Sequence, residues 1–137
     1  VVGSFLMCKS VIPILTEQGE GGKIVNISSI AGKVGTPNAS AYVAANAALQ
    51  GFTQSLAKGL GPHGISVNAV CPGITDTSRM DDLGRDEIWE KLLKDRVPLQ
   101  RAASDAEIAG LIAFLCTPRG EYINGQLINM DGGIATW

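Results

Sequence analysis

The sequence predicts an α/β fold with a three-stranded parallel sheet and flanking helices. Three short runs rich in β-branched residues predict strands at Lys23–Ser29, Ile65–Cys71 and Gln126–Met130. Helical segments separate these runs, so the connections are crossovers, and crossovers produce a parallel sheet. The first two runs are almost continuously apolar, as expected of strands covered on both faces.

Apolar spacing and capping residues place the helices before the second strand. The apolar pattern from Phe5 to Leu15 predicts a helix, which Pro13 is expected to kink or to end early. The alanine-rich stretch Ala39–Gly61 predicts a long helix, with Ser40 as a cap near its start.

The second half of the chain predicts two further helices. The segment Ile74–Ala103 is polar, and a helix is expected in it around Asp86–Lys94. Ser104-Asp105-Ala106-Glu107 has the spacing of a capping box and opens a helix that reaches about Cys116.

Composition limits the classes of function. The chain has 137 residues, 45% of them hydrophobic and 18% charged, which predicts one globular domain. A net charge of −2 with mixed signs argues against nucleic-acid binding. Three separated cysteines and a single histidine argue against a metal site and favour reduced thiols in a cytoplasmic protein. The apolar stretch Val1–Leu15 is too short to span a membrane.

Polar residues follow the predicted strands at their carboxyl ends, where open α/β sheets bind ligands. Ser28-Ser29, Pro72-Gly73 and Asp131-Gly132-Gly133 occupy these ends. Tyr42 and Asn46 lie four residues apart on the next helix and so share one face. We therefore expect a hydroxyl from Ser29, a phenol and an amide to converge at one crevice.

The order of these motifs resembles the short-chain dehydrogenase/reductase family. The resemblance rests on Ser29, on Tyr42 after twelve intervening residues, on Pro72-Gly73 after "VNAV", and on "NGQLINMDGG". It covers nearly the whole chain and corresponds to the C-terminal half of a doubly wound Rossmann-type sheet. The family's glycine-rich nucleotide loop belongs to an earlier βαβ unit, and no Gly-x3-Gly-x-Gly occurs in this sequence. Residues 1–137 are thus expected to form the catalytic half of the domain, inactive in isolation, with a substrate loop at 74–103.

The resemblance implies roles for individual residues. Tyr42 resembles the general acid–base residue, and Ser29 resembles the residue that hydrogen-bonds the substrate oxygen. Asn46 stands at the position of a lysine that binds the nicotinamide ribose and lowers the pKa of the tyrosine. The implied cofactor is NAD or NADP, held by a set of six residues. This set is Tyr42, Asn46, Pro72, Gly73, Thr75 and Thr77.

The implied partners are a small-molecule alcohol or carbonyl substrate and further copies of the chain, as a homodimer or homotetramer. The family forms a four-helix dimer interface, which would suit the small residues Ala44, Ala45, Ala47 and Ala48; helix propensity alone explains them equally simply. No metal, nucleic acid or membrane is expected.

The asparagine is the departure that matters chemically. A free tyrosine has a pKa of about 10, and a nearby ammonium is the usual way to lower it. Asn46 carries no charge, and we expect Lys33 to be a solvated loop charge that cannot replace the lysine. Two functions stay open: an oxidoreductase of the short-chain type, or a catalytically impaired relative that serves binding or assembly. A deliberately introduced asparagine is a third explanation.

Other candidate residues have structural interpretations. Asn26 and Asn68 are expected to be buried amides that satisfy backbone groups. Four apolar residues of the loop fit a substrate pocket and the buried side of a loop helix equally well. These residues are Met80, Leu83, Trp89 and Val97.

Overall fold

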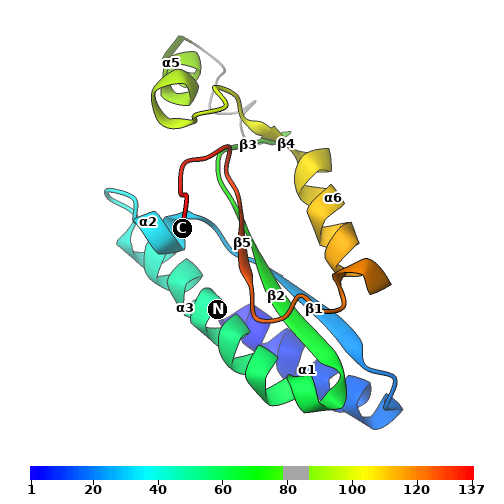
Figure 1. The fold of residues 1–137 in the computed structure, drawn as a ribbon. Coiled ribbons are helices and arrows are strands. Elements are labelled where there is room, and N and C mark those ends of the chain that lie inside the picture. Colours follow the sequence, from blue (N-terminus) through cyan, green and yellow to red (C-terminus); the bar gives the residue numbers. More distant parts are fainter. Residues whose placement is uncertain (79–86) are drawn as a thin grey trace.

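Three parallel strands form the sheet, in the order β1-β2-β5 (Figure 1). The computed structural model describes residues 1–78 and 87–137. The strands are β1 (Gly22–Ile27), β2 (Ile65–Pro72) and β5 (Leu127–Met130). Ile24 pairs with Val67 and Val70 pairs with Ile128. The predicted α/β fold and parallel sheet are confirmed, with strand ends that differ from the prediction by one or two residues.

Helices cover both faces of the sheet because β2 alternates its side chains between them. On one face, Val67 packs with residues of α1 (Val2–Gln18) and α3 (Ser40–Leu60). On the other face, Val70 packs with Ile108 and Leu115 of α6 (Asp105–Leu115). All four of these β2 and α6 side chains are buried, so this double packing supplies the core.

Pro13 lies inside α1, and the helix continues past it to Gln18. The expectation that this proline ends the helix early is therefore wrong. The helix stops at Gly19, which has φ 70° and accepts the left-handed conformation at little cost. Glycine, and not proline, sets this boundary.

Of the two predicted N-caps, one is confirmed and one is wrong. Ser104 is the N-cap of α6 and shares the capping box with Glu107, as predicted. Ser40 is the first residue of α3; the N-cap is Ala39, whose side chain makes no capping bond, so the predicted cap is wrong. The expected loop helix is α5 (Glu87–Arg96), whereas Met80 and Leu83 lie outside the described residues.

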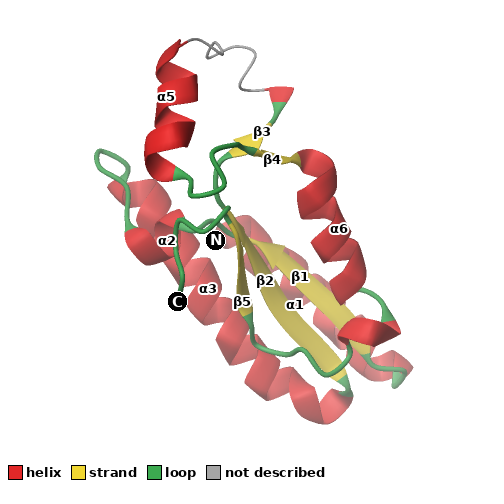
Figure 2. Ribbon diagram, turned by 45° about the horizontal axis from the view of Figure 1, so that its top comes forward, coloured by secondary structure: helices red, strands yellow, loops and turns green. Residues whose placement is uncertain are grey.

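A second, very short sheet closes the ends of the polar segment. β3 (Thr75–Asp76) and β4 (Ala103–Ser104) pair in parallel, and Ala103 N donates to Ile74 O at 3.0 Å. Figure 2 shows this pair and α5 beyond the carboxyl ends of the main strands. Two-residue strands have no readable period, and the sequence did not predict them.

Short helices complete the fold. α2 (Ala31–Val34) follows β1, and 3₁₀ turns η1 (Gly61–His63) and η2 (Pro118–Gly120) follow α3 and α6. Within the described residues, no helix has the length and apolar character needed to cross a lipid bilayer.

The two strand asparagines are buried and hydrogen-bonded, but only Asn68 satisfies backbone groups as predicted. Asn68 is 1% exposed, donates to Ile123 O at 2.7 Å and accepts from Gln126 N at 2.9 Å. Asn26 instead donates to the side chain of Thr53 on α3, at 2.9 Å. One amide fixes the approach to β5, and the other fixes α3 against β1.

The α2 turn lies directly against α3 at Gly32. A Cβ atom at this position would come 2.8 Å from Ala47 N and 2.9 Å from the Asn46 carbonyl carbon. Real side chains do not tolerate such contacts with backbone, so glycine is needed for the close approach.

Gly32→Ala is expected to lower the free energy of unfolding by about 1–3 kcal/mol, the usual cost of overpacking. Urea denaturation followed by circular dichroism measures it. The control is Gly110→Ala in the middle of α6, where an added Cβ meets nothing within 4 Å. This control should stabilise by about 0.5–1 kcal/mol, because alanine favours helix over glycine. Equal effects at both positions would contradict the steric account.

Candidate functional site

Backbone hydrogen bonds hold the carboxyl ends of the three strands together. Ile30 N donates to Pro72 O at 3.1 Å, which ties the turn after β1 to the end of β2. Gly73 N donates to Met130 O at 2.9 Å, which ties β2 to β5. A Cβ on Gly73 would lie 2.7 Å from the Cα of Asp131, so these two segments touch. The predicted meeting of the three polar strand ends is therefore observed.

Ser29 occupies the turn after β1 and is 9% exposed. Its Oγ accepts a hydrogen bond from Ala31 N at 3.2 Å, and its carbonyl oxygen accepts from Gly32 N at 3.1 Å. The first bond uses a lone pair of the hydroxyl oxygen and leaves its hydrogen for another acceptor. The side chain is thus oriented as a hydrogen-bond donor.

Tyr42 and Asn46 lie one turn apart near the start of α3. The Tyr42 side chain is 55% exposed. Asn46 Nδ2 donates to Tyr42 O at 2.9 Å, and Asn46 Oδ1 accepts from Ser28 Oγ at 3.3 Å. The helix of Tyr42 is thereby joined to the residue that precedes Ser29. An approach of Ser29 Oγ to Tyr42 Oη within about 3–5 Å, at hydrogen-bond or one-water range, stays a prediction.

The other proposed cofactor contacts lie at the end of β2 and just beyond it. Pro72 is its last residue, and Gly73 and Thr75 follow within contact of one another, with Thr75 Oγ1 3.5 Å from Gly73 O. Thr77 is exposed after β3. Pro72, Gly73, Thr75 and Thr77 thus lie close together along the chain at and just after the carboxyl end of β2.

Lys33 is not the solvated loop charge that the sequence suggested. It lies half-buried in α2, and its Nζ donates to Leu127 O at 2.9 Å and to Asn129 Oδ1 at 2.6 Å, both on β5. Burial raises the pKa of the nearby Cys71 thiol, while the Lys33 charge and a hydrogen bond with Ser28 oppose that rise. The lysine is therefore a structural cation bound to β5.

Sequence reasoning missed two polar residues around the site, Gln50 and Asn129, and assigned no bonds to Asp131, which it had placed at the end of the third strand. Gln50 Nε2 donates to Ser29 O at 2.9 Å. Asp131 accepts from Gly133 N at 3.0 Å and from Ala135 N at 2.7 Å, which shapes the turn after β5. Asn129 joins Lys33 to Ala135 O. Gln50 could have been found, because it follows Tyr42 and Asn46 at the same four-residue spacing along α3.

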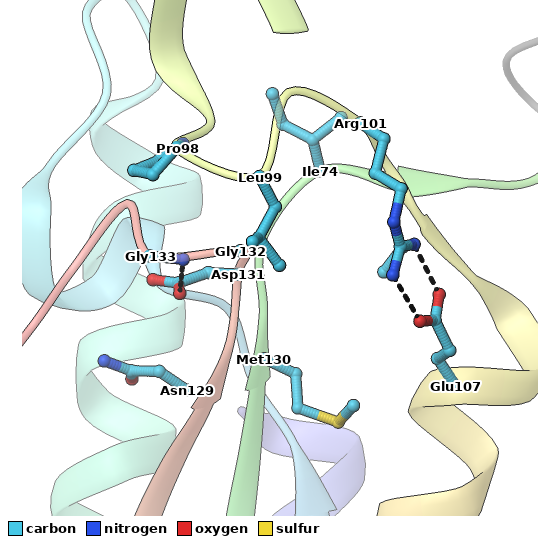
Figure 3. A pocket seen from close by; sticks show the side chains of 11 residues that line it. Ile74, Pro98, Leu99, Arg101, Glu107, Asn129, Met130, Asp131, Gly132 and Gly133 are labelled. Carbon is cyan, nitrogen blue, oxygen red and sulfur yellow. Dashed lines mark hydrogen bonds and ion pairs between the residues drawn. The ribbon is translucent and has the colours of Figure 1, made fainter.

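A cavity of about 550 Å³ opens beside the end of β5 (Figure 3). Apolar side chains that include Ile74, Leu99 and Met130 line it, and the paired Arg101 and Glu107 stand at its wall. Neither Ser29 nor Tyr42 is among its lining residues. The residues that line this cavity are thus other than the two proposed catalytic residues.

Arg101 and Glu107 form a bidentate ion pair, in which Nη1 donates to Oε2 at 2.8 Å and Nη2 donates to Oε1 at 2.7 Å. Hydrogen bonds from Arg101 and from the backbone and side chain of Ser104 lower the pKa of Glu107 to about 2.

Among the described residues, no group of three or more His, Cys, Asp or Glu side chains is placed to hold a metal ion.

Similarity to known proteins covers nearly the whole chain. The sequence model of the family described as enoyl-(acyl carrier protein) reductase matches residues 1–135. The chain belongs to the short-chain dehydrogenase/reductase family. It is 40% identical over 135 residues to a 3-oxoacyl-(acyl-carrier-protein) reductase of Synechocystis, and the match covers 98% of this chain and 52% of that protein.

Solved structures of short-chain dehydrogenases agree in fold. Acetoin dehydrogenase from Enterobacter cloacae superposes with a TM-score of 0.86 at 42% identity, over 98% of this chain and 52% of its own. A 4-hydroxyisoleucine dehydrogenase mutant, solved with NADH and succinate, gives a TM-score of 0.94 at 28% identity, over 98% and 56%. The chain spans about half the length of the relatives it matches, and it forms the C-terminal half of the family's Rossmann fold.

Glu107 makes stability depend on acidity. Because its pKa in the folded protein is about 2, below the ordinary 4.5, its contribution is complete above pH 4.5 and is lost as the pH falls towards 2. Glu107→Gln should flatten this part of the stability profile, measured by thermal unfolding from pH 2 to 6. Glu17→Gln on α1 removes the same charge as a control; an equal flattening there would contradict the assignment.

Proposed function

We propose that this chain supplies the catalytic residues of an NAD(P)-dependent oxidoreductase that interconverts an alcohol and a carbonyl compound. The observation that carries this is a pair of hydrogen bonds, Ser28 Oγ to Asn46 Oδ1 at 3.3 Å and Ile30 N to Pro72 O at 3.1 Å. Together they hold the helix of Tyr42, the turn of Ser29 and the end of β2 at one edge of the sheet. The oxidoreductases among its relatives support the same class of reaction.

The proposed chemistry assigns one task to each side chain. Ser29 donates its hydroxyl hydrogen to the substrate oxygen, in the orientation fixed by Ala31 N. Tyr42 gives a proton to that oxygen during carbonyl reduction and takes it back during alcohol oxidation. Its exposure leaves the phenol accessible to a substrate.

Bound NAD(P) would supply or accept the hydride. The donor set fits the nicotinamide end: Asn46 Nδ2 carries two hydrogens, and Tyr42 O accepts one, so the other can meet a ribose hydroxyl. The main chain at Pro72 and Gly73, with the hydroxyls of Thr75 and Thr77, would hold the nicotinamide amide. The sequence contains no Gly-x3-Gly-x-Gly loop for the pyrophosphate, so these residues account for one end of the cofactor only.

The segment 74–103 is proposed as the substrate loop of a partial Rossmann-type dehydrogenase domain spanning residues 1–137. Its two ends are paired through β3 and β4, and Leu99 N donates to Gly132 O at 3.1 Å. Buried Val97 packs at the same turn, where a Cβ on Gly132 would meet it at 2.6 Å. These anchors support a segment fixed at its base beside the strand ends.

A second function has one specific observation in its favour. Asn46 replaces an ammonium by a neutral amide, and both atoms of that amide bond to the chain itself. A relative that keeps the fold for binding or assembly would retain such a residue at no cost to its role. Turnover, and not cofactor binding, separates this alternative from the enzyme.

Self-association is proposed through the outer face of α1 and α3. The rings of Phe5 and Phe52 meet between these helices in a tilted arrangement, with centroids 5.8 Å apart, and Phe5 stays half-exposed. Leu6 and Met7 are exposed on α1 as well, but successive residues of a helix do not share one face. The half-exposed Phe5 beside Phe52 is therefore the proposed contact, and a second copy of the chain is the occupant that the family suggests.

Asn46→Lys is expected to raise alcohol oxidation near neutral pH at least about tenfold. A nearby opposite charge lowers a pKa by roughly 1–3 units, and each unit gives about tenfold more phenolate. The fold should accept the change, because Ser28 Oγ keeps the backbone oxygen of residue 46 at 3.2 Å. NAD(P)H absorbance with ethyl 3-hydroxybutyrate and 2,3-butanediol across pH 6–10, in the complete protein, measures the rate.

Tyr42→Phe added to Asn46→Lys should abolish the gain, because no titrating hydroxyl remains. If neither the parent nor Asn46→Lys turns over any substrate while both bind cofactor, the binding-or-assembly function stands. A parent that is already as fast as the lysine variant would mean that another group tunes Tyr42.

Phe5→Glu should shift the protein towards a lower oligomeric state in sedimentation velocity, because it places a carboxylate in the proposed apolar interface. Tyr122→Glu, at a fully exposed position after η2, is the control and should leave the sedimentation coefficient unchanged. A monomeric parent would disprove the interface.

A further inference from the structure

Gln50 is a buried polar residue with no role in the proposed mechanism. It is 5% exposed, on the face of α3 that meets β1 and α2. Its Nε2 donates to Ser29 O at 2.9 Å and to Ser28 Oγ at 3.1 Å, and Cys71 Sγ lies at 3.7 Å. An amide nitrogen carries two hydrogens, so the two serine oxygens use both of them.

These bonds extend into a continuous chain between the two proposed catalytic groups. Ser28 Oγ lies 3.3 Å from Asn46 Oδ1 and 3.2 Å from Asn46 O, and Asn46 Nδ2 donates to Tyr42 O. The chain therefore runs from the backbone of Tyr42 through Asn46, Ser28 and Gln50 to the backbone of Ser29. The two ends of this chain of hydrogen bonds are the backbone oxygens of Tyr42 and Ser29, and the groups between them are side chains.

The surroundings leave Gln50 little room to move. A Cβ on Gly32 would come 2.7 Å from Gln50 Nε2, so the α2 turn closes over the amide. Buried polar groups that are fully hydrogen-bonded fix a single arrangement of the elements they join. Here the joined elements are the turn of Ser29 and the helix of Tyr42.

We propose that Gln50 is a positioning residue that sets the geometry between the Ser29 hydroxyl and the Tyr42 phenol. This rests on the proposed function. Ser29 O has two donors, Gly32 N and Gln50 Nε2, and the first belongs to the same turn. The glutamine is the donor that ties the turn to α3. Without it the turn can shift relative to the helix while the fold persists.

The test is Gln50→Met, which keeps the length of the side chain and removes its N–H groups. Small misplacements of reacting groups reduce rates by up to about 100-fold, so kcat for NAD(P)H-dependent reduction of ethyl acetoacetate should fall about 10- to 100-fold. KM should change less than about threefold, because substrate contacts are retained. Gln54→Met, an exposed glutamine one turn later on α3, is the matched control and should change neither constant.

A second readout does not depend on turnover. Ala31 N binds Ser29 Oγ, so its hydrogen-exchange protection, measured by NMR, reports the Ser29 turn. Gln50→Met should lower that protection about tenfold at unchanged protection in β2, a loss of about 1.4 kcal/mol at the turn alone. Should the parent, assayed as the full-length protein, show no turnover, the proposed function fails, and this measurement still decides the positioning role.

Unchanged kcat, or unchanged Ala31 protection in a protein without turnover, would overturn the proposal. An equal loss in kcat and in protection throughout β2 would also overturn it, because it would mean general destabilisation. If Gln50→Met does not fold, Ser28→Ala breaks the same chain at its middle link; it should lower kcat at nearly constant KM, and parental kcat would reject the role.

Discussion

The bond from Ile30 N to Pro72 O is the constraint on which the rest of the site depends. It joins the turn after β1 to the last residue of β2, beyond the final paired residues Ile27 and Val70, and so helps to fix where the chain turns into α2. In that turn Ser29 Oγ accepts a hydrogen bond from Ala31 N, and Gly32 lies against α3. Two neighbouring strands thereby determine where a helix on the sheet's face must sit.

Asn46 has a structural task in this chain, at the position to which the family resemblance assigns a charged side chain. An ammonium at this point would act on the Tyr42 phenol through its charge, whereas the amide bonds to Tyr42 O and Ser28 Oγ. The helix and the serine turn gain a connection, and the phenol gains no charged neighbour. The same residue therefore adds hydrogen bonds to the fold and supplies no charge to the proposed site.

Sequence patterns predicted the elements whose periods are long enough to read, such as β2 and α3, and the capping box at Ser104. They failed where a contact distant in sequence decides the outcome. Lys33 was expected in solvent because its acceptors, Leu127 O and Asn129 Oδ1 on β5, are distant in sequence and no pattern near Lys33 indicates them. Pro13 was expected to kink α1 or to end it early, but the helix continues to Gln18 and Leu15, beyond the proline, packs against the core. Tyr42 and Ser29 were chosen by motif order, which carries no information about the amide of Gln50 between them.

The close approach of Gly32 to α3 has an evolutionary consequence. A methyl group at 32 would come 2.7 Å from Gln50 Nε2 and 2.8 Å from Ala47 N, so a shorter or redirected residue 50 would relieve only the first contact. Position 32 is therefore expected to stay glycine in lineages that keep this packing, whatever residue stands at 50, because the contact with the α3 backbone remains.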